Sequence, residues 1–343
     1  MPTAFNIDKT TLTFGSDQNN IAENNYPLKV WGVQQNFNFP TLYLSELKAK
    51  EIEITNAELE LLIQTEKIIK EVSETYIELQ ILINKLEIFK EIDSLYTKIF
   101  TDTEKKYNKG DATNLDLLNI KAKKQQAKQQ LDDVKYKIDN YYQKLKTFVG
   151  NDTDFTISKE LKTLNLNEKN IEESNVYKLL NSQNNLNENI IKIEKDKLLP
   201  DVSFNYFIGT NFLEHAKYYH GFEVGIAIPL FFNSQKAKIK AAEIAMEANQ
   251  QIAEYEIQLL KTKQKELKKY IIKYKDKIDY HNATGKELYE EIIRTSSISY
   301  EKGEIDFFKF ANSLEVALQI KIDYFDNILI YNNLIFSLIY ISI

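Results

Sequence analysis

Cysteine is absent from the 343 residues of this sequence, which excludes a disulfide framework, a thiol nucleophile and a thiolate metal site. Basic residues are dispersed and the net charge is −6, so we expect no nucleic-acid-binding surface. No apolar run approaches the roughly 18 residues of a membrane-spanning helix. The N-terminal stretch MPTAFNIDKTTLTFG lacks the basic start and the apolar core of a signal peptide.

Motifs of enzymes are missing as well. The sequence shows no Gly-rich phosphate loop, no nucleophile motif and no clustered set of His, Asp and Glu. We therefore expect no catalytic residues, no enzymatic activity and no cofactor. The length corresponds to about two ordinary domains.

Proline and glycine avoid two long stretches of the chain. All five prolines lie within 2–40 or 200–229. Residues 41–109 contain neither glycine nor proline, and residues 230–302 contain only Gly285. Because a proline inside a helix costs about 3 kcal/mol, its absence permits two very long helices. At about 1.5 Å per residue, each would reach roughly 100 Å.

Both stretches carry an apolar residue at nearly every seventh position. The first series has Thr75 as its one polar member, and its apolar members are Leu47, Ile54, Leu61, Ile68, Leu82, Phe89 and Tyr96. The second series is Ile239, Met246, Ala253, Leu260, Leu267, Tyr274, His281 and Leu288. A sustained seven-residue repeat predicts helices that pack as in a coiled coil.

A short sequence occurs twice, at an offset of 193 positions: YNKGDATNLDLLNIKAKKQQ from Tyr107 and YEKGEIDFFKFANSLEVALQ from Tyr300. Gly110 and Gly303 suit the left-handed position that ends a helix. We expect Asp111 and Glu304 to open a return helix, where a carboxylate suits the positive end of the helix dipole. The chain therefore contains two helical hairpins.

The proline-bearing segments alternate in polarity with a period of two, which predicts strands. In PDVSFNYFIGTNF and GFEVGIAIPLFF, one face is bulky and apolar from Val202 to Leu230, and the other is mostly small or polar. The first copy is less regular: TAFNIDKTTLTFG, a polar loop, then PLKVWGVQQNFNF with Trp31, Val33, Phe37 and Phe39 on one face. This pattern is a weak signature of a transmembrane β-barrel. From the strands alone, a soluble hairpin with one buried face is equally acceptable.

These segments predict a mainly α-helical fold with a small β part, organised as two repeats. The first repeat is 1–150, with a β-hairpin at 2–40 and a helical hairpin at 41–149. The second is 151–343, and its parts are a linker at 151–170, a helix at 172–198, a β-hairpin at 200–231 and a helical hairpin at 234–343. Four strands cannot close a barrel, and lipid does not tolerate open edges. Three copies would supply twelve strands, and their helices would continue the tube.

The chain resembles the outer-membrane efflux protein family, the TolC-like exit ducts of tripartite pumps. The resemblance rests on KLLPDVSFNYF, GFEVGIAIPLFFNSQKAKIKAAE, YNKGDATNLDLLNIKAK and YEKGEIDFFKFANSLEVAL, in this order. The stretch NNIAENNYPLKVWGVQQNFNFPTLY resembles the heavy-metal branch of the resistance-nodulation-division (RND) class, which sometimes forms the C-terminal part of a fused pump polypeptide. A cytosolic coiled-coil scaffold is the rival reading of the heptads.

The resemblance implies a homotrimer with a twelve-stranded barrel in outer-membrane lipid and a tunnel of very long antiparallel helices in the periplasm. It implies two further partners, a periplasmic adaptor and an inner-membrane RND pump. The chain itself would be a passive conduit for exported substrates, with heavy-metal cations as the cargo of that branch.

Two sets of site residues follow from the resemblance. The hairpin tips, with Gly110, Gly303, Tyr107 and Tyr300, are expected to dock the adaptor while also serving as ordinary helix ends. The residue six positions after each glycine is expected to line a constriction, and here it is Asp116 or Lys309, with Asn119 or Asn312 three residues further on. Lys309 departs from an acidic ring. Asp116 and Lys309 could pair across neighbouring hairpins and latch the tunnel, or be two plain surface charges.

A metal site is not expected. The three histidines are His215 and His220, in a strand-connecting loop, and His281, on the heptad stripe where a packed histidine is ordinary. With no cysteine and Met246 as the only internal methionine, ligands for soft metals are nearly absent.

The lengths of the helical stretches predict a missing piece. The first repeat descends over 41–108 and returns over 111–149 and 172–198, whereas the second descends over 234–302 and returns only over 306–343. By this count a helix of roughly 25–30 residues and an export signal should precede the first repeat, given about 1.5 Å per residue. We expect the chain to be part of a longer polypeptide.

Overall fold

The computed structural model describes residues 7–150, 154–166 and 170–341. The chain forms two compact units, one made of Met1–Leu62 and Asn175–Gln258 and the other of Ile63–Ser174 and Leu259–Ile343. Two helices, α1 (Pro40–Lys109) and α4 (Asn233–Tyr280), each extend from one unit into the other. The repeats predicted from the sequence therefore contribute to both units.

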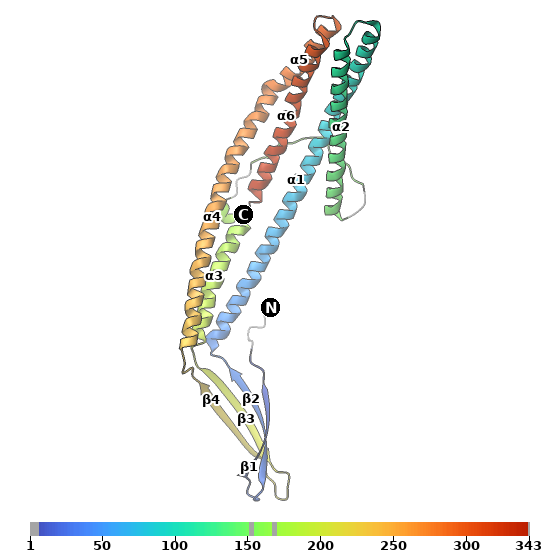
Figure 1. Cartoon of the computed structure of the whole chain (residues 1–343). Coiled ribbons are helices and arrows are strands. Elements are labelled where there is room, and N and C mark those ends of the chain that lie inside the picture. Colours follow the sequence, from blue (N-terminus) through green and yellow to red (C-terminus); the bar gives the residue numbers. More distant parts are fainter. Residues whose placement is uncertain (1–6, 151–153, 167–169, 342–343) are drawn as a thin grey trace. The chain divides into compact units, whose positions relative to one another are not determined.

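The first unit contains one antiparallel sheet, in the order β1-β2-β3-β4 (Figure 1). The strands are β1 (Thr11–Ile21), β2 (Pro27–Phe37), β3 (Asp201–Thr210) and β4 (Tyr219–Ala227). The two predicted β-hairpins are thus joined into a single sheet through the β2–β3 pairing. The edges of the sheet are β1 and β4.

The first strand differs from the prediction. The alternation placed it within TAFNIDKTTLTFG and followed it with a polar loop, but β1 begins at Thr11 and includes Ser16 to Ile21. Pairing with β2 continues through Ser16↔Lys29 and Asp17↔Leu28 and resumes at Ile21↔Pro27 after a register shift. Backbone pairing therefore overrides the polar sequence. Residues 3–6 of the predicted strand lie outside the described residues.

The two faces of the sheet differ as the alternation predicted, because cross-strand partners share a face. One face carries bulky apolar side chains: Leu12, Phe14, Trp31, Val33, Phe37, Val202, Phe204, Tyr206, Ile208, Phe222, Val224 and Ile226. The other face carries all five strand glycines, which are Gly15, Gly32, Gly209, Gly221 and Gly225. Phe39, Ile228 and Leu230, which the pattern placed in strands, lie just beyond the strand ends.

Three helical segments complete the first unit. They are the first part of α1, the first part of α4, and α3 (Asn175–Asp196), where the sequence predicted a helix at 172–198. Ser45 of α1 donates its Oγ hydrogen to Asp196 Oδ2 at 2.6 Å, and its carbonyl accepts from Asn189 Nδ2 at 2.6 Å. These contacts fix α3 against α1.

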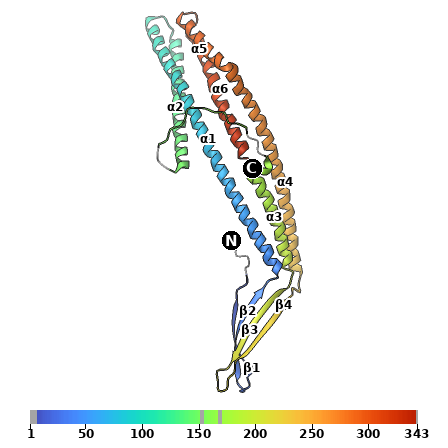
Figure 2. The same ribbon diagram turned by 180° about the vertical axis from the view of Figure 1, so that it is seen from behind.

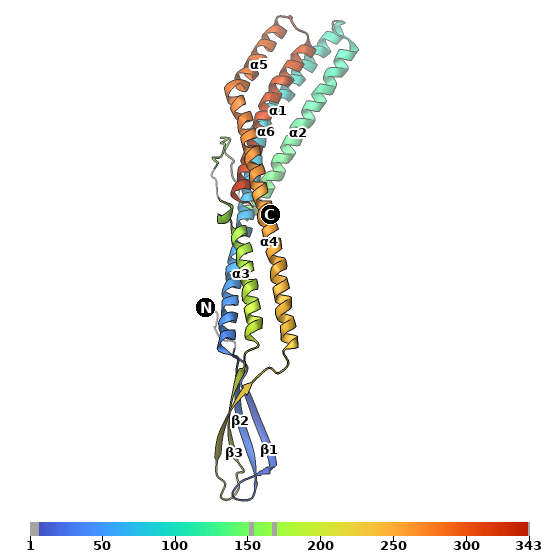
Figure 3. The same ribbon diagram turned by 90° about the vertical axis from the view of Figure 1, so that its left-hand side faces the viewer.

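The second unit contains both helical hairpins (Figures 2 and 3). The first hairpin is α1 with α2 (Asn114–Val149), and the second is α5 (Lys286–Glu301) with α6 (Phe307–Ile339). A core of fully buried apolar side chains joins them, including Ile81, Ile88, Ile120, Ile278 and Ile335. The predicted helix 41–108 agrees with α1 to within one residue at each end.

The second descending helix is interrupted, which the heptad pattern did not predict. A π-helical turn, η2 (His281–Gly285), separates α4 from α5. The imidazole of His281 stacks on the ring of Tyr324, with centroids 3.9 Å apart and planes 18° apart. A Cβ on Gly285 would lie 3.0 Å from His281 Nδ1, so glycine leaves the room that the histidine ring needs. The helix is locally widened where this aromatic stack forms.

The described linker, 154–166, is held by side chains of both hairpins. Gln80 of α1 donates to the carbonyls of Ser158 and Glu160 at 2.8 and 2.7 Å. On α6, Asn332 accepts from the Leu164 amide at 3.0 Å and donates to the carbonyl of Lys162 at 3.0 Å. The linker between repeats is therefore a strap across the second unit rather than a loose connection.

Candidate docking tips of the helical hairpins

The two hairpin tips share one backbone geometry. Gly110 has φ +83° and Gly303 has φ +73°, which confirms the predicted left-handed helix ends. The amide of Gly110 donates to the Tyr107 carbonyl and the amide of Asp111 to the Lys106 carbonyl, at 3.0 and 2.9 Å. The second tip repeats both bonds at the corresponding positions, again at 3.0 and 2.9 Å. Both turns are Schellman motifs.

The return helices begin later than predicted. Asp111 and Glu304 were expected to open them, but α2 starts at Asn114 and α6 at Phe307. The caps are Thr113 and Asp306, which occupy matching positions. Asp111 and Glu304 instead donate their backbone amides to the Schellman turns, so the extended residues that follow carry the caps.

Asp116 and Lys309 both lie in the first turn of a return helix, at equivalent positions. Asp116 Oδ2 accepts from Thr113 Oγ1 at 2.7 Å and from the Thr113 amide at 3.0 Å, while Thr113 Oγ1 accepts from the Asp116 amide. This reciprocal arrangement is a capping box. The two hydrogen bonds from Thr113 lower the pKa of the exposed Asp116 carboxyl.

In the second hairpin the carboxylate has moved to the cap itself. Asp306 Oδ1 accepts from the Lys309 amide at 2.8 Å. The departure at Lys309 from an acidic residue is therefore accompanied by an acid three residues earlier. No ion pair joins Asp116 to Lys309 within the described residues, so a latch across neighbouring hairpins stays a prediction.

The other predicted tip residues lie in unequal environments. Tyr107 is 40 % exposed, whereas Tyr300 stacks on Phe310 with ring centroids 4.6 Å apart. Burial, followed by the charge of Asp102, raises the pKa of the Tyr300 hydroxyl. Asn119 and Asn312 are both exposed. Of the two tyrosines, Tyr107 is therefore the more open to solvent.

A groove of about 800 Å³ lies between the two tips, within the second unit. Its acidic lining residues are Asp102, Asp111, Asp116, Glu301 and Asp306. Its basic lining residues are Lys98 and Lys106, and Phe307 and Phe308 supply apolar surface. Of the predicted site residues, Asp116, Tyr300 and Gly303 line this groove, whose surface is acidic and partly aromatic.

Sequence reasoning missed the polar contacts that tie the hairpins together. Glu315 of α6 accepts at Oε1 from Tyr96 Oη at 2.6 Å and from Lys123 Nζ at 2.8 Å. Although burial by itself would raise the pKa of Glu315, the hydrogen bonds from Lys123 and Tyr96 lower it. A second ion pair also joins α1 to α6, in which Lys85 Nζ lies 2.5 Å from Asp326 Oδ1. No local pattern signals these pairs, because their partners lie on different hairpins.

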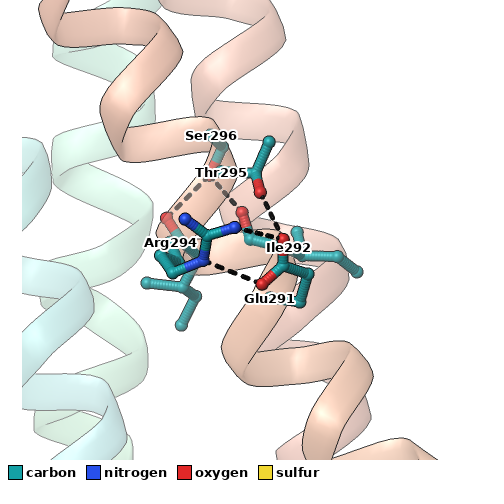
Figure 4. Close-up of polar contacts among 6 residues, drawn as sticks. Glu291, Ile292, Arg294, Thr295 and Ser296 are labelled. Carbon is teal, nitrogen blue, oxygen red and sulfur yellow. Dashed lines mark hydrogen bonds and ion pairs between the residues drawn. The ribbon is translucent and has the colours of Figure 1, made fainter.

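The only arginine of the chain, Arg294, lies on α5 near the second tip (Figure 4). Its Nε and Nη2 donate to the two carboxylate oxygens of Glu291 at 2.8 and 2.6 Å, and Thr295 Oγ1 donates to Oε1 at 2.9 Å. The hydrogen bonds from Arg294, which contribute most, and the hydrogen bond from Thr295 together lower the pKa of Glu291 to about 2. The opposite charges of Glu291 and Arg294 are therefore held in a fixed arrangement on the exposed surface of α5.

The three histidines lie in different environments. His220 lies in β4 and not in the preceding loop, where the sequence placed it, because it pairs with Ile208 of β3. Its Nδ1 is 2.6 Å from Tyr206 Oη on the apolar face of the sheet, and His281 is part of the aromatic stack. His215 has φ +59° in the loop before β4. In the described part of the chain, no three His, Cys, Asp or Glu side chains form a group suited to a metal ion. None of the described helices combines the length and apolar character needed to cross a membrane.

The sequence matches a known family over part of its length. Residues 17–151 match the family described as outer membrane efflux protein, which confirms the resemblance over this region. No curated protein matches the sequence. The matched region covers β2, α1, α2 and the first tip with Gly110.

Solved structures extend the likeness to almost the whole chain. A membrane protein from Pseudomonas aeruginosa aligns with a TM-score of 0.80 at 14 % identity, covering 98 % of this chain and 83 % of that one. CusC, described in terms of transmembrane channel formation, gives 0.77 at 13 %, covering 97 % and 81 %. The open state of the MtrE outer membrane channel from Neisseria gonorrhoeae gives 0.74 at 12 %, covering 97 % and 79 %.

These likenesses define the fold as that of TolC-like outer-membrane channels: long antiparallel helices with four strands per chain. The fold class predicted from the sequence is confirmed. Members of the matching family are efflux proteins rather than enzymes, which supports the expectation that the chain catalyses no reaction.

Proposed function

We propose that the chain is the subunit of an outer-membrane exit duct of a tripartite RND-type efflux system. Several copies would close the sheet into a barrel and the helices into a periplasmic tunnel, through which the exported substrates pass passively. The observation that carries the proposal is the sheet, which has two open edges and an uncovered apolar face.

The apolar face of the sheet needs a lipid-like environment. Its side chains are exposed, with Leu12 at 77 %, Phe222 at 72 % and Ile226 at 67 %. A soluble protein rarely leaves so continuous an apolar surface in water. In a membrane the free-energy cost of exposing these side chains to water is removed, because hydrocarbon chains cover them.

The edges need a second copy. Within the described residues β1 pairs only with β2, and β4 only with β3. Unpaired backbone groups in hydrocarbon cost several kcal/mol each, by order of magnitude. Pairing of β4 from one copy with β1 of the next removes both edges, and the resemblance implies a homotrimer.

The long helix α1 also presents an uncovered apolar stripe. Ile54, Leu61 and Ile68 are seven residues apart and are exposed by 46, 68 and 57 %. Further along the same series, Leu82 and Tyr96 are buried, with exposures of only 5 and 4 %. The series thus packs within the chain at one end, and a neighbouring copy would cover the other end.

The tips are the proposed docking surface for the periplasmic adaptor, which connects to an RND pump in the inner membrane. Support comes from exposed apolar side chains around the first tip, with Leu115 at 67 %, Leu118 at 54 % and Tyr107 at 40 %. Phe308 at the second tip is exposed by 46 %. The proposed assignment to the heavy-metal branch, with heavy-metal cations as the cargo, rests only on the sequence of residues 19–43.

Engineered cysteines test the closure, because the chain has none of its own. Thr13→Cys on β1 is combined with single cysteines scanned along β4, in protein refolded into lipid vesicles. We expect disulfides between copies, with ladders up to three chains on a non-reducing gel. Gln35→Cys with Phe204→Cys, which are paired residues of one chain, is the control and should give only an internal link. If no β1–β4 pair links two copies while the control pair forms, the duct proposal is wrong.

A further inference from the structure

The charged residues of the four strands are sorted by sign between the faces of the sheet. Asp17 pairs with Leu28, Glu223 with Asn205 and Asp201 with Ala227, which places all three acids on the glycine-bearing face. The single strand lysine, Lys29, pairs with Ser16 and Thr210 on the opposite, apolar face. The glycine-bearing face therefore carries acids without a strand base to neutralise them.

Glu223 belongs to a polar row that crosses all four strands. The pairings Thr11↔Gln34, Gln34↔Asn205 and Asn205↔Glu223 place these four side chains in line. Asn205 Nδ2 donates to Glu223 Oε2 at 3.4 Å, while Asn205 Oδ1 is shielded from solvent and has no hydrogen-bond partner among the described residues. The row ends in the carboxylate of Glu223, whose negative charge attracts cations.

We propose that this face lines the exit of the duct and favours cationic over anionic solutes, with Glu223 as the principal residue. The inference rests on the proposed function, because the row becomes a ring only when copies close the sheet. It names the class of solute that the exit favours. The effect is a field along the wall rather than a binding site, and the three carboxylates of each copy supply that field.

Salt dependence distinguishes such a field from a tight binding site. The Debye length is about 30 Å at 0.01 M salt and about 3 Å at 1 M. A field from wall charges therefore acts across a wide lumen in dilute salt and is screened in concentrated salt. We expect cation preference at about 0.01 M KCl to vanish near 1 M.

The experiment measures reversal potentials of the assembled protein in planar bilayers under a KCl gradient at low salt. Glu223→Gln should lower the K⁺ to Cl⁻ permeability ratio by about twofold or more, since it removes one of the three acids of each copy. Asn205→Lys should move the ratio further, toward anions. Lys29→Gln, which removes a charge from the apolar face, is the matched control and should leave the ratio unchanged.

The outcomes separate the two claims. If the protein conducts and both Glu223→Gln and Asn205→Lys leave the ratio unchanged, the selectivity inference is overturned and the duct stands. An effect of Lys29→Gln equal to that of Glu223→Gln would also overturn it, because net charge rather than the face would then matter. A protein that inserts without conducting contradicts the duct, and the inference falls with it.

Discussion

The first helical hairpin descends through one uninterrupted helix, α1, whereas the second descends through α4, the π-helical turn η2 and α5. At the offset of 193 positions, His281 corresponds to Ile88 and Tyr324 to Leu131. Ile88 and Leu131 are buried apolar residues, with exposures of 1 and 8 %. One repeat thus fills its interior with aliphatic side chains where the other uses an aromatic stack containing a titratable ring.

The tips differ in a smaller way. Both end their descending helix with the same Schellman turn, but the first caps its return helix with Thr113 and Asp116 and the second with Asp306 alone. The backbone geometry of the turn has been kept, while the side chains that satisfy the helix start have changed. The hairpins are therefore equivalent as folding units and different as surfaces, which suits two non-identical contacts with partners.

The largest expected effect tests the part that the hairpins share. Gly110→Ala and Gly303→Ala should each weaken their turn by about 1–2 kcal/mol, the cost of placing an L-residue in the left-handed region. No atom lies within 4 Å of the added Cβ at either position, so the two costs should be equal. Hydrogen exchange of the last turn of α1 and of α5 measures the effect.

Gly15→Ala is the control for the glycine substitutions. Its added Cβ also meets nothing within 4 Å, and its φ lies outside the left-handed range. Exchange at the tips should therefore not change. Markedly unequal effects of Gly110→Ala and Gly303→Ala would show that the two turns are not equivalent.

The caps give a smaller effect that should differ between the hairpins. Thr113→Ala and Asp306→Ala should each weaken the first turn of a return helix by about 1 kcal/mol. Asp116→Ala should weaken α2 as well, because it removes one half of the capping box, whereas Lys309→Ala should leave α6 unchanged. Hydrogen exchange of residues 114–118 and 307–311 reads both ends. Equal fraying after Asp116→Ala and Lys309→Ala would contradict the different capping.

The smallest expected effect is a response to acid that only the second hairpin should show. Burial, followed by the charge of Lys286, lowers the pKa of His281 below its ordinary value of 6.5. The folded state therefore binds the proton less readily than the unfolded state. This contribution to stability is present above pH 6.5 and is lost as the pH falls through the lowered value.

Hydrogen exchange around η2 should accordingly rise between neutral pH and about pH 5, after correction for the intrinsic exchange rate. The region around Ile88 should show no such rise. His281→Phe, which retains an aromatic ring without a titrating nitrogen, should remove the response. A response that persists in His281→Phe would assign it to another group.

Much of this fold could be predicted because its signals are local. The absence of glycine and proline from 41–109 predicted α1, and the repeated glycine turn predicted both tips. The capping signal at Thr113 and Asp116 is also present in the sequence, but the acidic residues nearer the turn favour an earlier helix start. The strand alternation predicted both faces of the sheet, and pairing with β2 then extended β1 through polar residues.

Other features depend on residues that are distant in the sequence. Because His281 occupies a heptad position, the sequence predicts a continuous α-helix there. The π-helical turn is explained only by the stacking of His281 on Tyr324, which is distant in the sequence. Glu315 meets Tyr96 and Lys123 because the two hairpins pack together, which no local pattern encodes. Asp116 and Lys309 could be predicted as equivalent positions from the repeated turn, but whether they pair with each other depends on how the hairpins pack.

The number of chains in the assembled protein tests the central claim most directly. Each copy has two open strand edges and an apolar stripe on α1, so the account predicts that detergent-refolded protein has about three times the 40.1 kDa mass of one chain. Native mass spectrometry, which resolves bound detergent from protein mass, gives this number. A stable, membrane-inserted single chain would contradict the account.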